Sequence, residues 1–394
     1  MADESIVIVG MSRTPMGGLQ GDFATVSAPA LGAVAIEGAL KETGIKPEEI
    51  DEVYMGCVLP AGIGQAPARQ AAIGAGLPKS TACTTVNKMC GSGMETVRLA
   101  HNALMAGSAN IIIAGGMESM SNSPYILPKM RSGARIGHTD VKDHMFLDGL
   151  EDAYEKGTLM GVYAERTAEK YGFSREAQDE FAISSLSRAN EAIEKGYFKD
   201  EISPVTVKSR KGETVVDTDE QPGKARPEKI PSLRPAFAKD GTVTAANASS
   251  ISDGASAIIM MHEAEAVKRG LKPIARIVGH SVHAQEPNWF TTAPVGAMKK
   301  LYEKTGWTDA DVDLYEINEA FAVVTMAAMH DLNLDHAKVN VHGGACALGH
   351  PVGSSGSRIM ITLLSALKTH GGKRGIASLC IGGGEATAVA LELM

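Results

Sequence analysis

The chain has 394 residues, a formal net charge of −8, and 44% hydrophobic and 21% charged residues. This composition excludes a disordered or fibrous chain, and the length predicts two or three compact units. The acidic balance argues against a nucleic-acid surface, and no apolar run approaches the roughly 18 residues that a membrane-spanning helix needs. Because no positively charged leader precedes the first apolar run, we expect a cytoplasmic protein.

Apolar runs and helical patterns alternate along the first third of the chain. The predicted elements, in chain order, are strand 5–10, helix 28–43, strand 53–58, helix 96–106 and strand 109–114. This alternation predicts an α/β fold in which helices cover the faces of a sheet.

The same order returns near the C-terminus. Residues 40–45 resemble residues 302–307, and residues 111–116 resemble residues 378–383, at nearly one offset. We interpret these two pairs of similar stretches as a duplicated unit; chance similarity between common α/β motifs is the alternative.

A segment of different amino-acid composition separates the two halves. Residues 124–250 are rich in charge, glycine and proline, and they include helical patterns at 165–172 and 175–195. The segment is too long for a loop of a compact domain, so we predict an inserted subdomain, after which residues 253–261 return to the first half as a strand or a helix. The predicted boundaries are 1–121 with 250–272 for the N-terminal half, 122–249 for the inserted domain and 273–394 for the C-terminal half.

Two glycine-rich stretches each carry a candidate reactive cysteine. Cys90 precedes a helical pattern, where the helix dipole and free N–H groups are expected to lower the pKa of its thiol. Cys380 ends a strand before three glycines, which suits a second acid/base beside N–H groups that form an oxyanion hole. For each cysteine alone, a buried structural thiol is the alternative.

A third glycine-rich stretch, residues 343–353, contains His350, which suits a general base. The repeat offset gives Cys90 and His350 nearly equivalent places, so a pseudo-twofold arrangement would bring them together. His342, Cys346 and His350 have the spacing of a helical metal site. The glycines between them oppose a continuous helix, so we predict no metal site.

Five stretches together resemble the thiolases in this order along the whole chain: 87–94, 115–121, 318–322, 343–353 and 380–384. The resemblance implies a thiolase-like α/β fold. Two duplicated βαβαβαββ halves are stacked in five layers, α-β-α-β-α, and an inserted loop domain binds coenzyme A.

The resemblance also assigns roles to the motif residues. Cys90 is expected to carry the acyl group as a thioester, and His350 to take its proton. Cys380 is expected to exchange the α-proton of a second acetyl-CoA. Asn318 is expected to hold a water that completes one oxyanion hole with His350, and the N–H groups of Cys90 and Gly382 to form the other.

The substrate contacts that the resemblance implies are Ser249, against the pantetheine arm, with Met160, Phe290, Ala320 and Phe321. Gln221 replaces the tyrosine that accompanies a potassium site in some members, so we do not expect potassium activation. No cofactor is expected, because coenzyme A is a substrate and product. His342 replaces a common asparagine of the family.

The implied activity is that of an acetyl-CoA C-acetyltransferase, which condenses two acetyl-CoA molecules to acetoacetyl-CoA and CoA. A degradative 3-ketoacyl-CoA thiolase of broad chain length is the alternative, because it would share every catalytic residue. A ketoacyl synthase fits less well, since that family pairs its cysteine with two histidines. A lipid-binding relative without catalysis is disfavoured by the retained Cys90, His350 and Cys380.

Two further expectations concern partners. Residues 129–147 correspond to the family's tetramerisation loop, with Arg131, Arg135, His138 and Met145 on an exposed hairpin, which predicts a homotetramer built as a dimer of dimers; a dimer is the alternative. The phosphates of coenzyme A need cations. The candidates in the inserted domain are Lys208, Arg210, Lys211, Lys224, Arg226 and Lys229.

Overall fold

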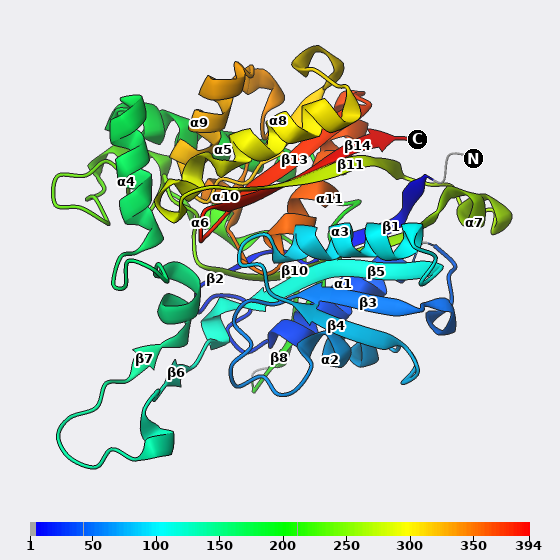
Figure 1. Ribbon diagram of the computed structural model, residues 1–394, viewed down its shortest axis with the longest axis horizontal. Coiled ribbons are helices and arrows are strands. Elements are labelled where there is room, and N and C mark those ends of the chain that lie inside the picture. The colour runs from blue at the N-terminus through cyan, green and yellow to red at the C-terminus, as the bar shows by residue number, and fades with distance from the viewer. Residues whose placement is uncertain (1–4, 42, 211) are drawn as a thin grey trace.

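The computed structural model describes residues 5–41, 43–210 and 212–394 (Figure 1). Its N-terminal half-sheet has the strand order β4-β3-β5-β10-β1. The strands are β1 (Ile6–Arg13), β3 (Glu52–Gly56), β4 (Ala82–Val86), β5 (Ile111–Ser119) and β10 (Ser252–His262), and the short β2 (Gly17–Gly18) pairs with β10. Strands β3, β4 and β5 are parallel, whereas β10 runs antiparallel to both β5 and β1.

The C-terminal half-sheet repeats this pattern in the order β12-β13-β14-β11. Its strands are β11 (Ala275–Ala284), β12 (Leu314–Ile317), β13 (Arg374–Ile381) and β14 (Glu385–Leu393). Strands β12 and β13 are parallel and the remaining pairs antiparallel, as in the first half. A parallel bridge between Tyr315 and Val339 stands where β4 pairs with β3. The predicted duplication is therefore confirmed, and a short β1–β11 pairing joins the two half-sheets.

Helices form three layers around these half-sheets (Figure 1). Helices α1 (Ala28–Lys41) and α2 (Pro67–Gly74) cover the outer face of the N-terminal half-sheet. Helices α8 (Ala293–Thr305) and α9 (Ala322–Leu332) cover the outer face of the C-terminal half-sheet. Helices α3 (Ser92–Met105) and α11 (Ser355–His370) pack between the two half-sheets, which completes the expected α-β-α-β-α order.

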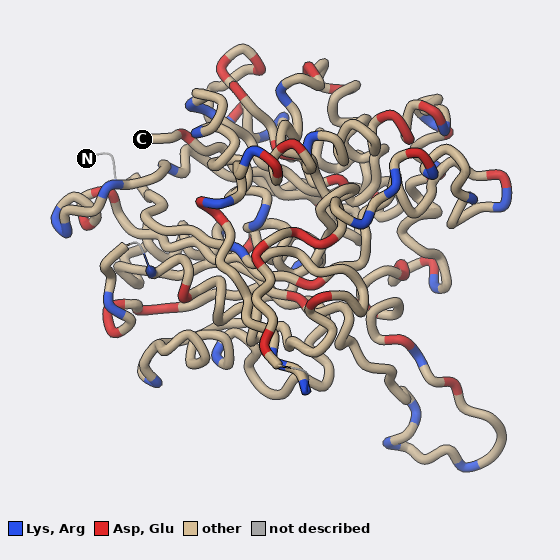
Figure 2. Tube along the Cα trace, turned by 180° about the vertical axis from the view of Figure 1, so that it is seen from behind, with Lys and Arg blue, Asp and Glu red and all other residues tan. Residues whose placement is uncertain are grey.

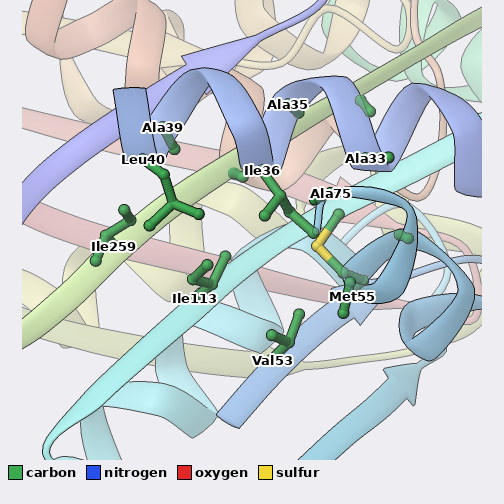
Figure 3. Packing of buried hydrophobic residues seen from close by; sticks show 14 of the residues in the cluster. Ala33, Ala35, Ile36, Ala39, Leu40, Val53, Met55, Ala75, Ile113 and Ile259 are labelled. Atoms are coloured by element: carbon green, nitrogen blue, oxygen red, sulfur yellow. The ribbon is translucent and has the colours of Figure 1, made fainter. Parts of the chain in front are cut away.

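The outer layers are held by ordinary apolar packing. Ile36 and Leu40 of α1 project toward Val53, Ile113 and other residues of the sheet (Figure 3). Burying each such side chain contributes about 1.5–3 kcal/mol. The small alanines along α1 let the helix lie close to the strands.

The central layer depends on close backbone contact between its two helices. A Cβ atom on Gly93 of α3 would lie 2.7 Å from the Ser357 hydroxyl oxygen, and one on Gly356 of α11 would lie 2.3 Å from the Met94 nitrogen. A Cβ atom on Gly116 of β5 would lie 1.9 Å from the Gly353 carbonyl oxygen. Only glycine fits these places, so the N-terminal ends of α3 and α11 meet. The loops that precede the two helices are thereby brought together.

The inserted region contains helices of its own and a projecting arm, residues 125–143 (Figure 1). Its elements are β6 (Tyr125–Ile126), β7 (Lys142–Asp143), α4 (Met160–Tyr171), α5 (Arg175–Glu194), β8 (Val205–Ser209), β9 (Gly212–Val216) and α6 (Glu220–Lys224). The short helices α7 (Glu263–Lys268) and α10 (Ala345–Leu348) lie outside it. The exact domain boundaries stay a prediction.

Several element limits differ from the predicted ones. Helix α4 begins at Met160 rather than 165. Helix α3 begins at Ser92 rather than 96, because its first turn, at Gly93, packs against the other central helix. Part of the similarity over residues 40–45 rests on Glu42, which is outside the described residues. Over the ranges that the structure describes, no helix has the length and apolarity required to cross a bilayer.

The central contact generates a prediction. Gly356→Ala should lower the free energy of unfolding by about 1–3 kcal/mol, because the added methyl group has no space beside the Met94 backbone. Gly223→Ala is the matched control, since nothing lies within 4 Å of the added carbon there. Urea unfolding of both variants measures the difference; equal stabilities would contradict the close contact.

Candidate active site

Cys90 lies in the tight loop that leads into α3. The preceding Met89 has a positive φ of 47°, and its N–H donates to the Asn87 side chain at 3.0 Å. The Lys88 N–H donates to the Ser92 hydroxyl at 2.9 Å. A Cβ atom on Gly91 would come within 2.4 Å of the Ile381 side chain. These contacts hold the Cys90 thiol at the wall of a pocket, beside the end of β13.

The prediction of a lowered pKa for Cys90 is wrong. Burial of the thiol raises its pKa, although the N–H groups of Gly382 and of Cys90 itself face the sulfur and oppose the rise. Helix α3 begins only at Ser92, and loss of water around the thiol outweighs the N–H groups that point to it. The direction of this shift favours the neutral thiol at Cys90.

His350 is buried, and its ring is oriented by a serine. Its Nδ1 lies 2.5 Å from the Ser355 hydroxyl oxygen, which lies 3.0 Å from the Pro351 carbonyl oxygen and donates to it. The Nδ1–H group therefore donates to Ser355, and Nε2 keeps its lone pair. Nε2 has no hydrogen-bond partner among the described residues. Burial, with a smaller effect of the Arg358 charge, lowers the pKa of His350 to about 3, so the ring is a neutral base at pH 7.

Cys380 ends β13 and is fully buried. Burial raises the pKa of its thiol well above the ordinary value, and the nearby Cys90 raises it further. The chain turns sharply after it, because Gly383 and Gly384 both have positive φ angles. This turn leaves Gly382 at the pocket wall, where a Cβ atom would meet the Met160 sulfur at 3.5 Å.

Asn318 follows β12 and is also buried. Its side-chain oxygen faces Arg358 at 3.5 Å, so its NH₂ group points elsewhere. That Nδ2 makes no hydrogen bond within the described parts of the chain and is free to donate. The neighbouring Glu319 accepts from the Ser185 hydroxyl at 2.7 Å and from the Cys346 N–H at 3.0 Å, which ties α5 to the loop that carries His350.

One pocket of about 470 Å³ gathers the predicted residues. Cys90, His350 and Gly382 line it, and so do all of the predicted substrate contacts, Met160, Ser249, Phe290, Ala320 and Phe321. Cys380 and Asn318 are buried and are not among its lining residues. Apolar side chains that the sequence analysis did not single out complete the lining, among them Leu19, Phe146, Leu150 and Phe237.

A second pocket of about 300 Å³ adjoins the first and shares Gln221, Ala245 and Ser250 with it. Three of the predicted cations, Lys224, Arg226 and Lys229, line this second pocket. Two of the other candidates lie elsewhere. Lys208 and Arg210 lie on the β8–β9 hairpin, which packs on the N-terminal half, and Lys208 pairs there with Glu213 at 3.3 Å. Lys211 is outside the described residues.

His342 and Cys346 do not join His350 in one cluster. Helix α10 has only four residues, as the glycines predict. His342 stacks on Tyr197 and places its Nε2 at 3.2 Å from the Nε2 of His370. Within the described ranges, no three or more His, Cys, Asp and Glu residues are arranged to hold a metal ion.

Sequence reasoning missed Ser355 and Arg358, which orient His350 and Asn318. The repeat offset contained a signal for Ser355, because it begins α11 where Ser92 begins α3. Arg358 lay inside a helical pattern with nothing to mark it. Its role follows from burial beside Glu316 and Asn318.

Comparisons with known proteins agree with this geometry. The family description "Thiolase, N-terminal domain" matches residues 6–264, and "Thiolase, C-terminal domain" matches residues 271–393. The chain is 48% identical over 394 residues to an acetyl-CoA acetyltransferase of Allochromatium vinosum, covering 100% of both chains. It is 49% identical over 390 residues to that of Cupriavidus necator, covering 98% of this chain and 99% of the relative. The crystal structure of the Bacillus anthracis acetyl-CoA acetyltransferase superimposes with a TM-score of 0.97 at 40% identity, covering 99% of each chain.

Proposed function

This chain belongs to the thiolase family, and we propose from that premise that it is an acetyl-CoA C-acetyltransferase. The reaction is the reversible Claisen condensation of two acetyl-CoA molecules to acetoacetyl-CoA and CoA. The observation that carries the proposal is the convergence of Cys90, His350 and Gly382 on one largely apolar pocket, with Cys380 in the apolar cluster that contains the lining residues Ala320 and Phe321.

The first half-reaction is acyl transfer to Cys90. The Nε2 lone pair of His350 takes the thiol proton as the sulfur attacks the acetyl carbonyl carbon, and the bond from that carbon to the CoA sulfur breaks. The departing CoA thiolate takes the proton of Cys380. The N–H groups of Cys90 and Gly382 face the reacting sulfur, so they are placed to stabilise the oxygen of the tetrahedral intermediate.

The second half-reaction forms the carbon–carbon bond. The Cys380 thiolate is a strong base because its thiol pKa is raised, which suits removal of an α-proton from the second acetyl-CoA. His350, now protonated at Nε2, and a water held by the free Asn318 NH₂ group would stabilise the enolate oxygen. The α-carbon then attacks the acetyl thioester, and the Cys90 sulfur leaves and regains a proton from His350.

Replacing Cys90 and replacing Cys380 should therefore impair different steps of the reaction. Cys90→Ser should form no stable acyl-enzyme, because an alkoxide is far harder to generate than a thiolate. Cys380→Ser should still be acetylated on Cys90, though more slowly because the departing CoA loses its proton donor, while condensation falls by about 10²–10⁴-fold or more through loss of a positioned acid/base. Intact-protein mass spectrometry after mixing with acetyl-CoA measures the first step, and acetoacetyl-CoA formation measures the second. An acetyl adduct on Cys90→Ser with none on Cys380→Ser would reverse these roles.

The second pocket suits the phosphates of coenzyme A, since Lys224, Arg226 and Lys229 gather beside the catalytic pocket in an otherwise acidic chain. We expect 3′-dephospho-CoA to bind more weakly than CoA. This gap in affinity should narrow at high salt, because salt screens exposed charges. Arg226→Gln should reduce the gap, whereas Lys208→Gln, on the distant hairpin, is the matched control. Calorimetric titration measures the affinities for CoA and 3′-dephospho-CoA. Equal affinities at low salt would contradict the assignment of a phosphate site.

The arm suits a tetramer, our proposed assembly. It projects from the body and carries basic residues along its length (Figures 1 and 2). Tyr125, Ile136 and Val141 are 69%, 97% and 58% exposed, an apolar surface that a second copy would cover. Met145 departs from the predicted exposed hairpin, because it is buried at the base of the arm.

Deletion of residues 133–141 should therefore convert a tetramer into dimers without loss of the fold. Light scattering of the full chain and of the deletion variant measures the change in mass. A full chain that is already dimeric, or a deletion variant that stays tetrameric, would contradict the assignment of the arm.

A further inference from the structure

Glu118 is a fully buried carboxylate on β5 that the proposed chemistry does not use. One carboxylate oxygen accepts from the Val58 N–H at 2.8 Å and from the Gly353 N–H at 3.0 Å. The other accepts from the Leu59 N–H at 3.1 Å and lies 3.6 Å from the Cys57 thiol sulfur. No cation is among these partners.

These hydrogen bonds join segments that are far apart in the sequence. Val58 and Leu59 follow β3, whereas Gly353 belongs to the loop that carries His350. The residues held in this way pack against the nucleophile loop in one apolar cluster, whose members include Val58, Leu59, Val352, Met89 and Cys90. The carboxylate therefore ties the base loop to the wall beside the nucleophile.

The charge of Glu118 also acts on Cys90. After burial, which has the largest effect, the negative charge of Glu118 is a cause that raises the pKa of the Cys90 thiol. Burial raises the pKa of Glu118 itself to about 7, against the three N–H bonds that lower it. The titratable groups on the segments around Glu118 include the following: Cys57 after β3, Lys88 and Cys90 before α3, His144 beside Met145, His350 before α11, Arg358 on α11 and Asp253 on β10.

Resting on the proposed thioester chemistry, we propose that Glu118 is a positioning residue with two effects. Its hydrogen bonds hold the His350 loop in register with Cys90, and its charge keeps Cys90 as a thiol until His350 takes the proton. Glu118 does not line the catalytic pocket, so it acts through these two residues rather than on the substrate.

Only a carboxylate at this position satisfies all of these donors. A glutamine has one acceptor oxygen, and its NH₂ group would oppose an N–H of Val58, Leu59 or Gly353. An aspartate keeps the charge but is one methylene shorter, so it cannot reach every N–H group in the same geometry.

The test compares Glu118→Gln, Glu118→Asp and Asp253→Asn. Asp253 is the matched control, since it is an equally buried carboxylate on the neighbouring strand that bonds to the Ser121 N–H at 2.9 Å. Two quantities are measured for each variant: kcat for acetoacetyl-CoA formation, and the pH midpoint of Cys90 alkylation by iodoacetamide, followed by peptide mass spectrometry.

In Glu118→Gln we expect kcat to fall by about 10–100-fold, because the base loop is misplaced, and the alkylation midpoint to move to lower pH, because a like charge is gone. Glu118→Asp should show a reduced kcat with the wild-type midpoint. Asp253→Asn should leave the midpoint unchanged.

An unchanged or raised midpoint in Glu118→Gln would overturn the proposal, since a purely structural role predicts loss of kcat alone. If that variant does not fold, Glu118→Asp decides: a midpoint lowered despite the retained charge, or an undiminished kcat, would overturn it. Alkylation does not require acetyl transfer. A wild-type protein that is alkylated but forms no acetoacetyl-CoA would therefore contradict the proposed function and leave the midpoint test intact.

Discussion

The site depends on one constraint, which is that the ends of two helices touch so closely that no side chain fits between them. Helices α3 and α11 are equivalent elements of the duplicated halves, and Gly93 and Gly356 let their backbones meet. Because the preceding loops carry Cys90 and His350, this contact places a cysteine from one half and a histidine from the other at one pocket. The proposed catalytic pair thus comes from two copies of the same helix-entry loop.

Burial at this contact then sets the protonation states. Loss of water raises the pKa of the Cys90 and Cys380 thiols and lowers the pKa of the His350 imidazole. Each shift disfavours the charged form and so favours a neutral resting site. In the proposed mechanism the proton moves when the substrate carbonyl is in place, and the N–H groups of Cys90 and Gly382 stabilise the charge that develops there.

The sequence predicted the α/β class and the duplication, and it singled out Cys90, His350 and Gly382, which line one pocket, because glycine-rich motifs with single reactive side chains are local signals. It did not single out the apolar side chains that complete the lining, such as Leu19 and Phe237. It did not predict the residues that act across distant segments. Arg358 and Glu118 bond to partners in distant segments, which no spacing reveals. Lys208 and Arg210 are near Lys224 and Arg226 in sequence but lie apart from them, because the β8–β9 hairpin folds against the N-terminal half. The pKa of Cys90 depends on a balance between burial and N–H groups that only packing decides.

The directions of the pKa shifts predict that Cys90 rests as a thiol and His350 as a neutral imidazole. Ultraviolet absorbance of the thiolate, recorded across pH for the wild-type protein and subtracted for Cys90→Ser, measures this state directly. We predict a thiolate signal from Cys90 only above the ordinary pKa of a cysteine, and no plateau of thiolate in the acidic range. A Cys90 thiolate already formed at pH 7 or below would mean a resting thiolate–imidazolium pair and would contradict the account.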